Sequence, residues 1–209
     1  MNLSAPTYNY PNRMGRIVLM SLEEIIGRTG VSAVLNRADL KEYIGNYPPH
    51  NQDLNFPFSH VSAILNGLEA LYGPHGGRGI ALRGGRSCFQ YGLREFGPLF
   101  GLTDLTFRLL PLHTKLKVGS NSFAEIFNRY SDQRVVVEND VKHLYWKITR
   151  CPMCWDRHTD VPSCHLAVGV LQEALYWVSG GKYFNVEETR CIGLGDETCT
   201  IVIDKTPLS

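Results

Sequence analysis

Apolar residues in the first half of the chain recur every three to four positions, which is the spacing of one buried helix face. Between residues 20 and 40 this face comprises Leu22, Ile25, Ile26, Val31, Val34 and Leu35. Because Gly27 and Gly30 lie within it, the pattern predicts either one helix or two short helices that divide there. A second face follows Ser59, whose side chain suits a helix N-cap. It comprises Val61, Ile64, Leu65, Leu68 and Leu71.

More helices follow the second face. The glycine-rich residues 73–79 (GPHGGRG) are expected to end the helix that carries that face. Three further helices are predicted over residues 80–96, 105–117 and 122–129. Pro111 is expected to kink or divide the middle one. The spacing around Gly84 and Gly85 matches no phosphate-binding loop, so this pair indicates close packing between helices.

After residue 132 the helical spacing gives way to strand-like runs. Residues 134–140 (RVVVEND) and 143–150 (HLYWKITR) predict a hairpin that turns at Asn139 and Asp140. Residues 164–181 predict a helix, with Ser163 as its cap and two glycines as its stop. The segments on either side of the short turn GDE predict a second hairpin at the C-terminus.

The order of these elements predicts the fold class. Helices, a hairpin, a helix and a second hairpin indicate one α+β domain, in which an antiparallel sheet of about four strands packs with helices. We expect this single domain to span residues 17–206. Residues 1–16 contain Pro6, Pro11 and several polar residues, which predicts a flexible N-terminal arm.

Composition and charge narrow the class of protein. The chain has 209 residues, of which 44% are hydrophobic, and this is enough to bury a core without disulfides. A formal net charge of +1 gives no basic field that would attract nucleic acid. The N-terminus lacks a signal-peptide pattern, and no apolar run approaches the ~18 residues of a membrane span. We therefore expect a cytoplasmic protein with no nucleic-acid partner and no membrane span.

Three of the six cysteines lie in one short segment, residues 151–165 (CPMCWDRHTDVPSCH), and the first two form a CxxC. A metal site, a redox pair, a disulfide and core packing all explain such a segment. In a reducing cytosol, clustered thiols favour metal binding or reactivity over disulfides. A redox CxxC is expected at a strand-to-helix turn of a βαβ unit, which the predicted order lacks. The isolated Cys88 is interpreted as a buried free thiol.

The C-terminal hairpin offers further metal ligands. Cys191 and Cys199 lie on either side of its turn, and Glu188 precedes Cys191 by three positions. Because a helix start can pack over the end of a hairpin, Cys164 completes a set of four. Three thiolates and one carboxylate suit a closed, tetrahedral zinc site. The CxxC thiols, Cys151 and Cys154, are alternative ligands that linear spacing does not separate from the carboxylate.

The strand predicted over residues 143–150 carries candidate pocket residues. Alternation places His143 and Tyr145 on one face and Trp146 on the other. A ligand pocket is expected at this strand, with Trp146 as a wall, His143 as a polar contact and Tyr145 beside it. Ordinary sheet packing uses the same residue types, so composition leaves both interpretations open.

The C-terminal part of the chain resembles the 4-vinyl reductase domain family. These small-molecule-binding domains are related to the aromatic-sensing domains of transcription activators and to TRAPP tethering subunits. The resemblance rests on Cys164 with Gly169 five residues later, the helix end GGK, the strand VEETRC and the hairpin GLGDETC. It is strong over residues 130–205 and weaker over the helical part.

The resemblance implies a fold of the NO-signalling and Golgi-transport ligand-binding type, and a homodimer. It implies an apolar ligand between helices and sheet, which is a hydrocarbon, an aromatic compound or a tetrapyrrole that the domain senses or carries. It also implies zinc held by Cys164, Glu188, Cys191 and Cys199, with Glu187 as an alternative to Glu188.

Two other functions follow from the same resemblance. The family name suggests a tetrapyrrole vinyl reductase, or a subunit of one, acting on a (bacterio)chlorophyll precursor. However, the chain shows no dinucleotide fingerprint, because CIGLGD lies in a hairpin and not at a strand-to-helix turn. A binding module is therefore preferred to an enzyme. The tethering relatives suggest a third function, a protein-interaction module.

Overall fold

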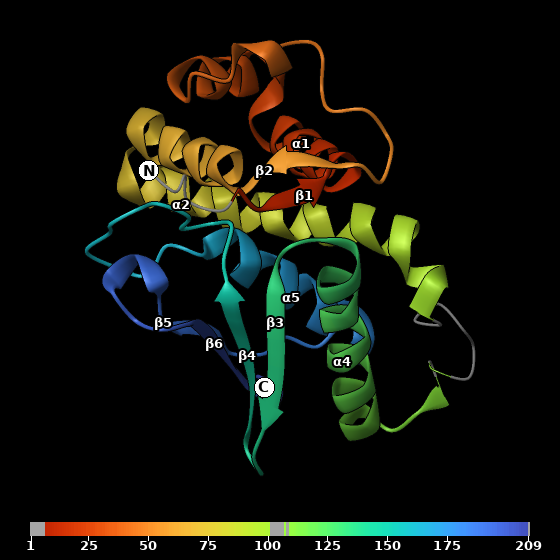
Figure 1. The fold of residues 1–209 in the computed structure, drawn as a ribbon. Coiled ribbons are helices and arrows are strands. Elements are labelled where there is room, and N and C mark those ends of the chain that lie inside the picture. The colour runs from red at the N-terminus through yellow and green to blue at the C-terminus, as the bar shows by residue number, and fades with distance from the viewer. Residues whose placement is uncertain (1–6, 101–106, 108, 209) are drawn as a thin grey trace, which may run out of the picture.

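The computed structural model describes residues 7–100, 107 and 109–208 of the chain, and they form a helical layer above an antiparallel sheet (Figure 1). The helices are α1 (Asn12–Arg37), α2 (Phe58–Phe96), α4 (Leu112–Tyr130) and α5 (His165–Ser179). The strands are β1 (Asn9–Pro11), β2 (Leu54–Pro57), β3 (Arg134–Asn139), β4 (His143–Arg150), β5 (Val186–Arg190) and β6 (Cys199–Asp204). Short 3₁₀ turns are η1 (Lys41–Tyr43), η2 (Gly97–Phe100) and η3 (Ile192–Leu194). The predicted α+β class is confirmed.

The main sheet has four antiparallel strands in the order β3-β4-β6-β5. Its register pairs Trp146 with Ile201 and Ile201 with Glu188. Directly paired residues of an antiparallel sheet project from the same face, so these three side chains form one row. All three are buried, which makes this the inner face of the sheet. The two predicted hairpins are therefore confirmed, and they lie side by side through β4 and β6.

Helix α5 lies between the sheet and α2, while α2 packs against α1 (Figure 1). Two glycines allow α2 and α5 to touch through their backbones. A Cβ added to Gly169 would lie 2.0 Å from the Leu82 carbonyl oxygen, and one added to Gly85 would lie 2.1 Å from the Leu166 oxygen. The interpretation of the α2 glycines as close helix packing is therefore confirmed at Gly85.

Several element boundaries differ from those predicted. Helix α1 begins at Asn12, before the helical face expected between residues 20 and 40, and it bends at Gly27, where φ is +70°. Residues 73–79 do not end the second helix, because the chain bends at Gly73, with φ of +74°, and then continues α2. A positive φ costs glycine no strain, so each bend is possible without a loop.

The prediction of an arm over residues 1–16 is wrong for residues 9–16. These residues form β1 and the start of α1, and Tyr10 and Met14 are 6% and 7% exposed. Burial of these apolar side chains in the core fixes the segment. Residues 1–6 lie outside the described part of the chain.

Helix α4 replaces two predicted helices. It runs without a break through the expected gap at residues 118–121, and Pro111 is its N-cap, which is a position proline tolerates. The predicted start of the first helix, residues 105–106, falls outside the described residues.

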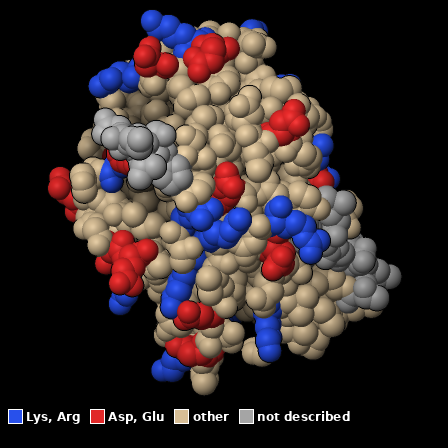
Figure 2. All heavy atoms as spheres, viewed as in Figure 1, with Lys and Arg blue, Asp and Glu red and all other residues tan. Residues whose placement is uncertain are grey.

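Charged side chains of both signs are interspersed over the face shown in Figure 2, as a net charge near zero suggests. This face therefore presents no field of a single sign. Within the described ranges, none of the helices is both long enough and apolar enough to cross a membrane.

Candidate functional site

Five thiols and one carboxylate gather where the sheet meets the start of α5. They are Cys151 and Cys154 in the loop after β4, Cys164 at the N-cap of α5, Glu188 on β5, Cys191 just after β5 and Cys199 at the start of β6. All six side chains are buried. The antiparallel register explains the gathering, because it pairs Ile148 near the end of β4 with Cys199. We refer to these six residues as the thiol cluster.

The sulfur atoms of the thiol cluster are spaced as ligands of one small ion. The Sγ atoms of Cys154 and Cys199 are 3.3 Å apart, and those of Cys151 and Cys164 are 3.5 Å apart. Cys191 Sγ lies 4.0 Å from Cys199 Sγ. Tetrahedral zinc with Zn–S bonds of ~2.3 Å places its sulfur ligands about 3.8 Å apart. The observed distances bracket this value, and all six cysteines of the chain are free thiols.

The thiol cluster contains two overlapping groups of four. In the first, the ligand atoms of Cys151, Cys154, Cys164 and Cys199 all lie within 4.8 Å of one another. In the second, the same limit holds for Cys164, Glu188, Cys191 and Cys199. The structure thus brings together both the predicted four ligands and the CxxC alternatives. Whether they hold zinc stays a prediction.

Glu188 is held in place by one oxygen and leaves the other free. Its Oε2 accepts a hydrogen bond of 2.7 Å from the backbone N–H of Cys164, which is one of the orphan donors at the start of α5. Its Oε1 is buried and has no hydrogen-bond partner among the described residues. Burial raises the pKa of this carboxyl to about 8, and the neighbouring Cys191 adds to the shift. Glu187, the alternative ligand, is exposed and belongs to neither group of four, so the structure favours Glu188 over it.

Neighbouring thiols of the cluster have pKa values that are shifted in opposite directions. Hydrogen bonds from neighbouring thiols, first that of Cys151, lower the pKa of Cys154 well below its usual range. Burial raises the pKa of the Cys151 thiol. Buried neighbours of like charge do not all ionise in the absence of a cation. A divalent cation removes this conflict, since it stabilises every thiolate that it binds.

Backbone N–H groups of the turn after β5 form hydrogen bonds that position Cys191 and Cys199. The backbone N–H of Ile192 donates to Cys199 Sγ at 3.3 Å. The N–H of Cys191 donates to the Asp196 carboxylate at 2.8 Å, and Gly195, with φ of +99°, lets the chain reverse. The Ile192 N–H stabilises negative charge on the Cys199 sulfur, and the bond from the Cys191 N–H to Asp196 fixes the backbone of this candidate ligand.

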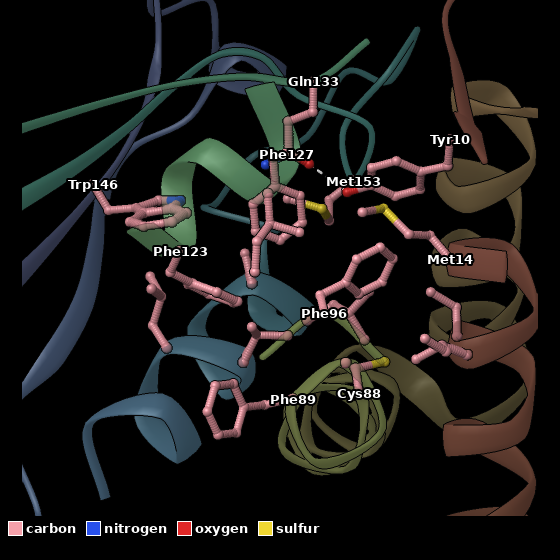
Figure 3. A pocket seen from close by; sticks show the side chains of 18 residues that line it. Tyr10, Met14, Cys88, Phe89, Phe96, Phe123, Phe127, Gln133, Trp146 and Met153 are labelled. Carbon is pink, nitrogen blue, oxygen red and sulfur yellow. Dashed lines mark hydrogen bonds between the residues drawn. The ribbon is translucent and has the colours of Figure 1, made fainter. Parts of the chain in front are cut away.

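An apolar cavity of about 100 Å³ lies between the helices and the inner face of the sheet (Figure 3). Six aromatic side chains contribute to its wall: Tyr10, Phe89, Phe96, Phe123, Phe127 and Trp146. Its lining also includes Gln133, which accepts a hydrogen bond from the Tyr10 hydroxyl. A smaller cavity of about 50 Å³ adjoins it and shares Phe89, Phe123, Trp146 and Leu171 as lining.

The structure separates the three predicted pocket residues. Trp146 lines both cavities, as expected for a wall. His143 and Tyr145 line neither, which corrects the prediction for these two. They lie on the outer face of β4, where the Tyr145 hydroxyl donates to the Asp140 carboxylate at 2.8 Å. The period-two alternation of the strand causes the separation, since neighbouring side chains point to opposite faces.

Several residues of the cavity wall lie next to residues of the thiol cluster in the sequence. Met153 lies between the two CxxC cysteines and lines the cavity. Leu166 and Ala167 follow Cys164 in α5 and line it as well. Sequence reasoning missed these wall residues, because apolar side chains on helix faces give the same signal for core packing as for a cavity.

A scan against protein-family models and a search of curated proteins found no match for this chain. Solved structures of similar fold do match. The Fe(II) unliganded H-NOX protein from K. algicida has 13% identity and a TM-score of 0.60, and the match covers 95% of this chain and 97% of that one.

Two further H-NOX structures give similar values. The H-NOX protein from S. oneidensis in the Fe(II)NO state has 13% identity and a TM-score of 0.55, over 93% of this chain and 99% of that one. A variant of Tt H-NOX has 13% identity and a TM-score of 0.56, over 95% of this chain and 97% of that one. At this identity the likeness shows the fold alone, and it agrees with the α+β fold that the sequence predicted and with the type of fold that the resemblance implied.

Proposed function

We propose that this chain is a binding module that senses or carries a small, uncharged, apolar molecule, and that zinc at the thiol cluster stabilises it. The observation that carries the proposal is the apolar cavity between the helices and the sheet. Close packing normally leaves few voids in a protein interior, so a lined apolar void is a candidate binding site. The resemblance to 4-vinyl reductase domains supports the same proposal.

The size and chemistry of the cavity limit the ligand. Its volume of about 100 Å³ is similar to that of an engineered apolar cavity of ~150 Å³ that binds benzene. Its described lining contains no Lys, Arg, His, Asp or Glu. A charged ligand would lose its hydration without gaining a partner there. The proposed ligand is therefore neutral and about the size of one aromatic ring, with Gln133 and Tyr10 as partners for a single polar group.

Haem, with which some of the similar structures are described, does not fit this cavity. No histidine belongs to the described lining, and no cation is present there to pair with the carboxylates of haem. By comparison with the cavity of ~150 Å³ that binds benzene, a tetrapyrrole is also larger than the ligand that this cavity suits. The same argument of size counts against the other tetrapyrroles that the resemblance suggests, and against a reductase that acts on them.

Zinc is the metal that the donor set favours. Buried thiolates with one carboxylate are soft to borderline ligands, and closed tetrahedral sites of this kind are typical of structural zinc. The metal would tie the loop after β4, the start of α5 and the last hairpin to one another. Because a metal that binds only the folded chain adds its binding energy to stability, this site would lock the cavity wall in place.

The interaction module has less support. A pure tethering domain needs no binding cavity, whereas this chain has an apolar cavity between its helices and its sheet. The homodimer implied by the resemblance stays a prediction that sedimentation of the full chain tests.

Calorimetric titration of the full chain with indole and with toluene tests ligand binding. Both probes are apolar aromatic molecules small enough to compare with the cavity. We expect binding to the unsubstituted chain, and at least a tenfold loss of affinity in Gly92→Leu. Gly92 lines the cavity, and a Cβ built there meets no atom within 4 Å, so the longer side chain can fill the space.

Gly79→Leu is the matched control. Gly79 lies on the same helix, is exposed, and also has no atom within 4 Å of an added Cβ, but it does not line the cavity. We expect this variant to bind both probes as the unsubstituted chain does. Equal affinity in all three proteins, or no binding of either probe to any of them, would overturn the proposed cavity function.

A further inference from the structure

The two groups of four ligands in the thiol cluster overlap in two residues, Cys164 and Cys199. Two tetrahedra that share two corners share an edge, and an ion can occupy the centre of each. We propose that the thiol cluster binds two divalent, thiophilic ions of the zinc class, bridged by the thiolates of Cys164 and Cys199. Cys151 and Cys154 would complete the coordination of the first ion, and Glu188 and Cys191 that of the second. The proposal extends the single zinc ion of the proposed function and does not depend on the cavity.

A single ion leaves two buried ligands without a bond to metal. If the ion takes the four thiols of the first group, Glu188 Oε1 keeps no partner among the described residues, and Cys191 keeps only its contacts with Ser163 and Cys199. If it takes the second group, the CxxC thiols keep only their contacts with Cys164 and Cys199. Glu188 is 8% exposed, and its Oε1 has lost water without gaining a hydrogen-bond partner among the described residues, which is costly for a polar atom. The second ion supplies the missing partner.

Charge does not oppose a second ion. Each group of the thiol cluster is anionic only when it binds metal, so a second divalent ion adds two positive charges together with two further anionic ligands. The net charge of the occupied thiol cluster therefore stays the same. Among the described residues, no Lys or Arg side chain makes an ion pair or hydrogen bond to any of the six groups, so bound cations would supply the positive charge that these ligands need when ionised.

The positions of the shared thiols fit a bridging role. Cys164 and Cys199 are both 0% exposed, and each lies close to a sulfur of the CxxC, at 3.5 and 3.3 Å. Cys199 also lies 4.0 Å from Cys191, while the backbone N–H of Cys164 meets the Glu188 carboxylate. Each shared residue thus contacts one residue of the CxxC pair and one residue of the pair Glu188 and Cys191.

Metal titration of the full, reduced, metal-free chain tests the proposal. Cobalt(II) is the first probe, because its thiolate charge-transfer absorption reports on ligation. We expect this absorption to rise until two equivalents have been added. Loading with cadmium-113 is expected to give two NMR resonances that couple to each other through the shared sulfurs. Native mass spectrometry with zinc is expected to give two ions per chain.

Variants locate the two ions. Cys154→Ser and Cys191→Ser each remove a terminal ligand of one ion and are expected to reduce the zinc content to one ion per chain. Cys88→Ser is the matched control, because Cys88 is a buried thiol outside the thiol cluster, and it should keep two ions. The cobalt and cadmium measurements use the unsubstituted chain, so they decide the question even if a variant fails to fold.

The outcomes separate this proposal from the single zinc ion. Saturation at one equivalent of cobalt, with a single cadmium resonance, would overturn the two-ion site and leave the single zinc ion standing. Binding of no metal would overturn both. Two equivalents with coupled cadmium resonances support the bridged pair.

Discussion

The thiol cluster and the apolar cavity are both buried on the inner side of the sheet, yet they are built in opposite ways. The ligands of the thiol cluster come from residues 151–199, and each is a chemically distinctive side chain. The cavity wall draws on residues between Tyr10 and Leu171, and nearly all of them are ordinary core residues. A candidate metal site can therefore be recognised in the sequence by its residue types. A binding cavity cannot, because it is a volume that side chains leave unfilled in the folded structure.

The two regions are nevertheless connected. Met153 lies inside the CxxC loop and Leu166 lies two residues after Cys164, and both line the cavity. Metal bound at the thiol cluster would hold the backbone of these wall residues in one position. The following variants test how far each region depends on the other.

Cys199→Ser should have the largest effect, because it removes a ligand that belongs to both groups of four. We expect the metal content to fall and the free energy of unfolding to drop by more than about 4 kcal/mol, which is typical of the loss of a structural metal. Urea denaturation together with elemental analysis measures both quantities. Unchanged stability in this variant would show that the thiol cluster is not a structural metal site.

Gly169→Ala tests the helix crossing that forms one side of the cavity. The added methyl group would collide with the Leu82 carbonyl, so we expect a loss of about 1–3 kcal/mol of stability with the metal content unchanged. Thermal unfolding checks this. Gly79→Ala on α2 has open space around its added carbon and should be neutral or slightly stabilising. Equal stability of the two variants would contradict the close backbone contact.

Tyr10→Phe tests the polar end of the cavity without touching the thiol cluster. It removes the hydroxyl that donates to Gln133, which is 2% exposed, and leaves that amide oxygen unpaired. We expect the free energy of unfolding to fall by about 1–2 kcal/mol. Burial raises the pKa of Tyr10 well above its usual value, so the hydroxyl stays protonated and this loss should not change between about pH 6 and 9. A loss that disappears within this range would contradict the assignment.

Glu69→Gln should have the smallest effect. Glu69 on α2 pairs with Arg157 of the cysteine loop at 3.3 Å and with Arg78 at 3.8 Å. These groups are partly exposed, so water screens the pairs and the expected loss is below about 1 kcal/mol. Metal content and probe affinity should stay the same. A larger loss in chemical denaturation would show that this contact, and not metal, positions the cysteine loop.

Local patterns predicted much of the fold. The hairpins at residues 134–150 and 186–204 and the helix that begins after Cys164 follow from strand-like runs, a hairpin turn and a glycine stop, all within a few residues. The bend at Gly27 was one of the two predicted alternatives. The continuation of α2 beyond Gly73 was missed, because a glycine and a proline usually end a helix.

The amino-acid sequence alone identified the candidate metal ligands, since thiols are rare and their chemistry belongs to the residue type. It also indicated that Trp146 and His143 lie on opposite faces, because a strand alternates. It did not separate Glu188 from Glu187 or place the CxxC beside them. Those answers depend on the register between β5 and β6 and on the pairing of β4 with β6, which brings the end of β4 to Cys199. The cavity, too, arises only when side chains from distant segments pack together, because an unfilled volume belongs to no single residue.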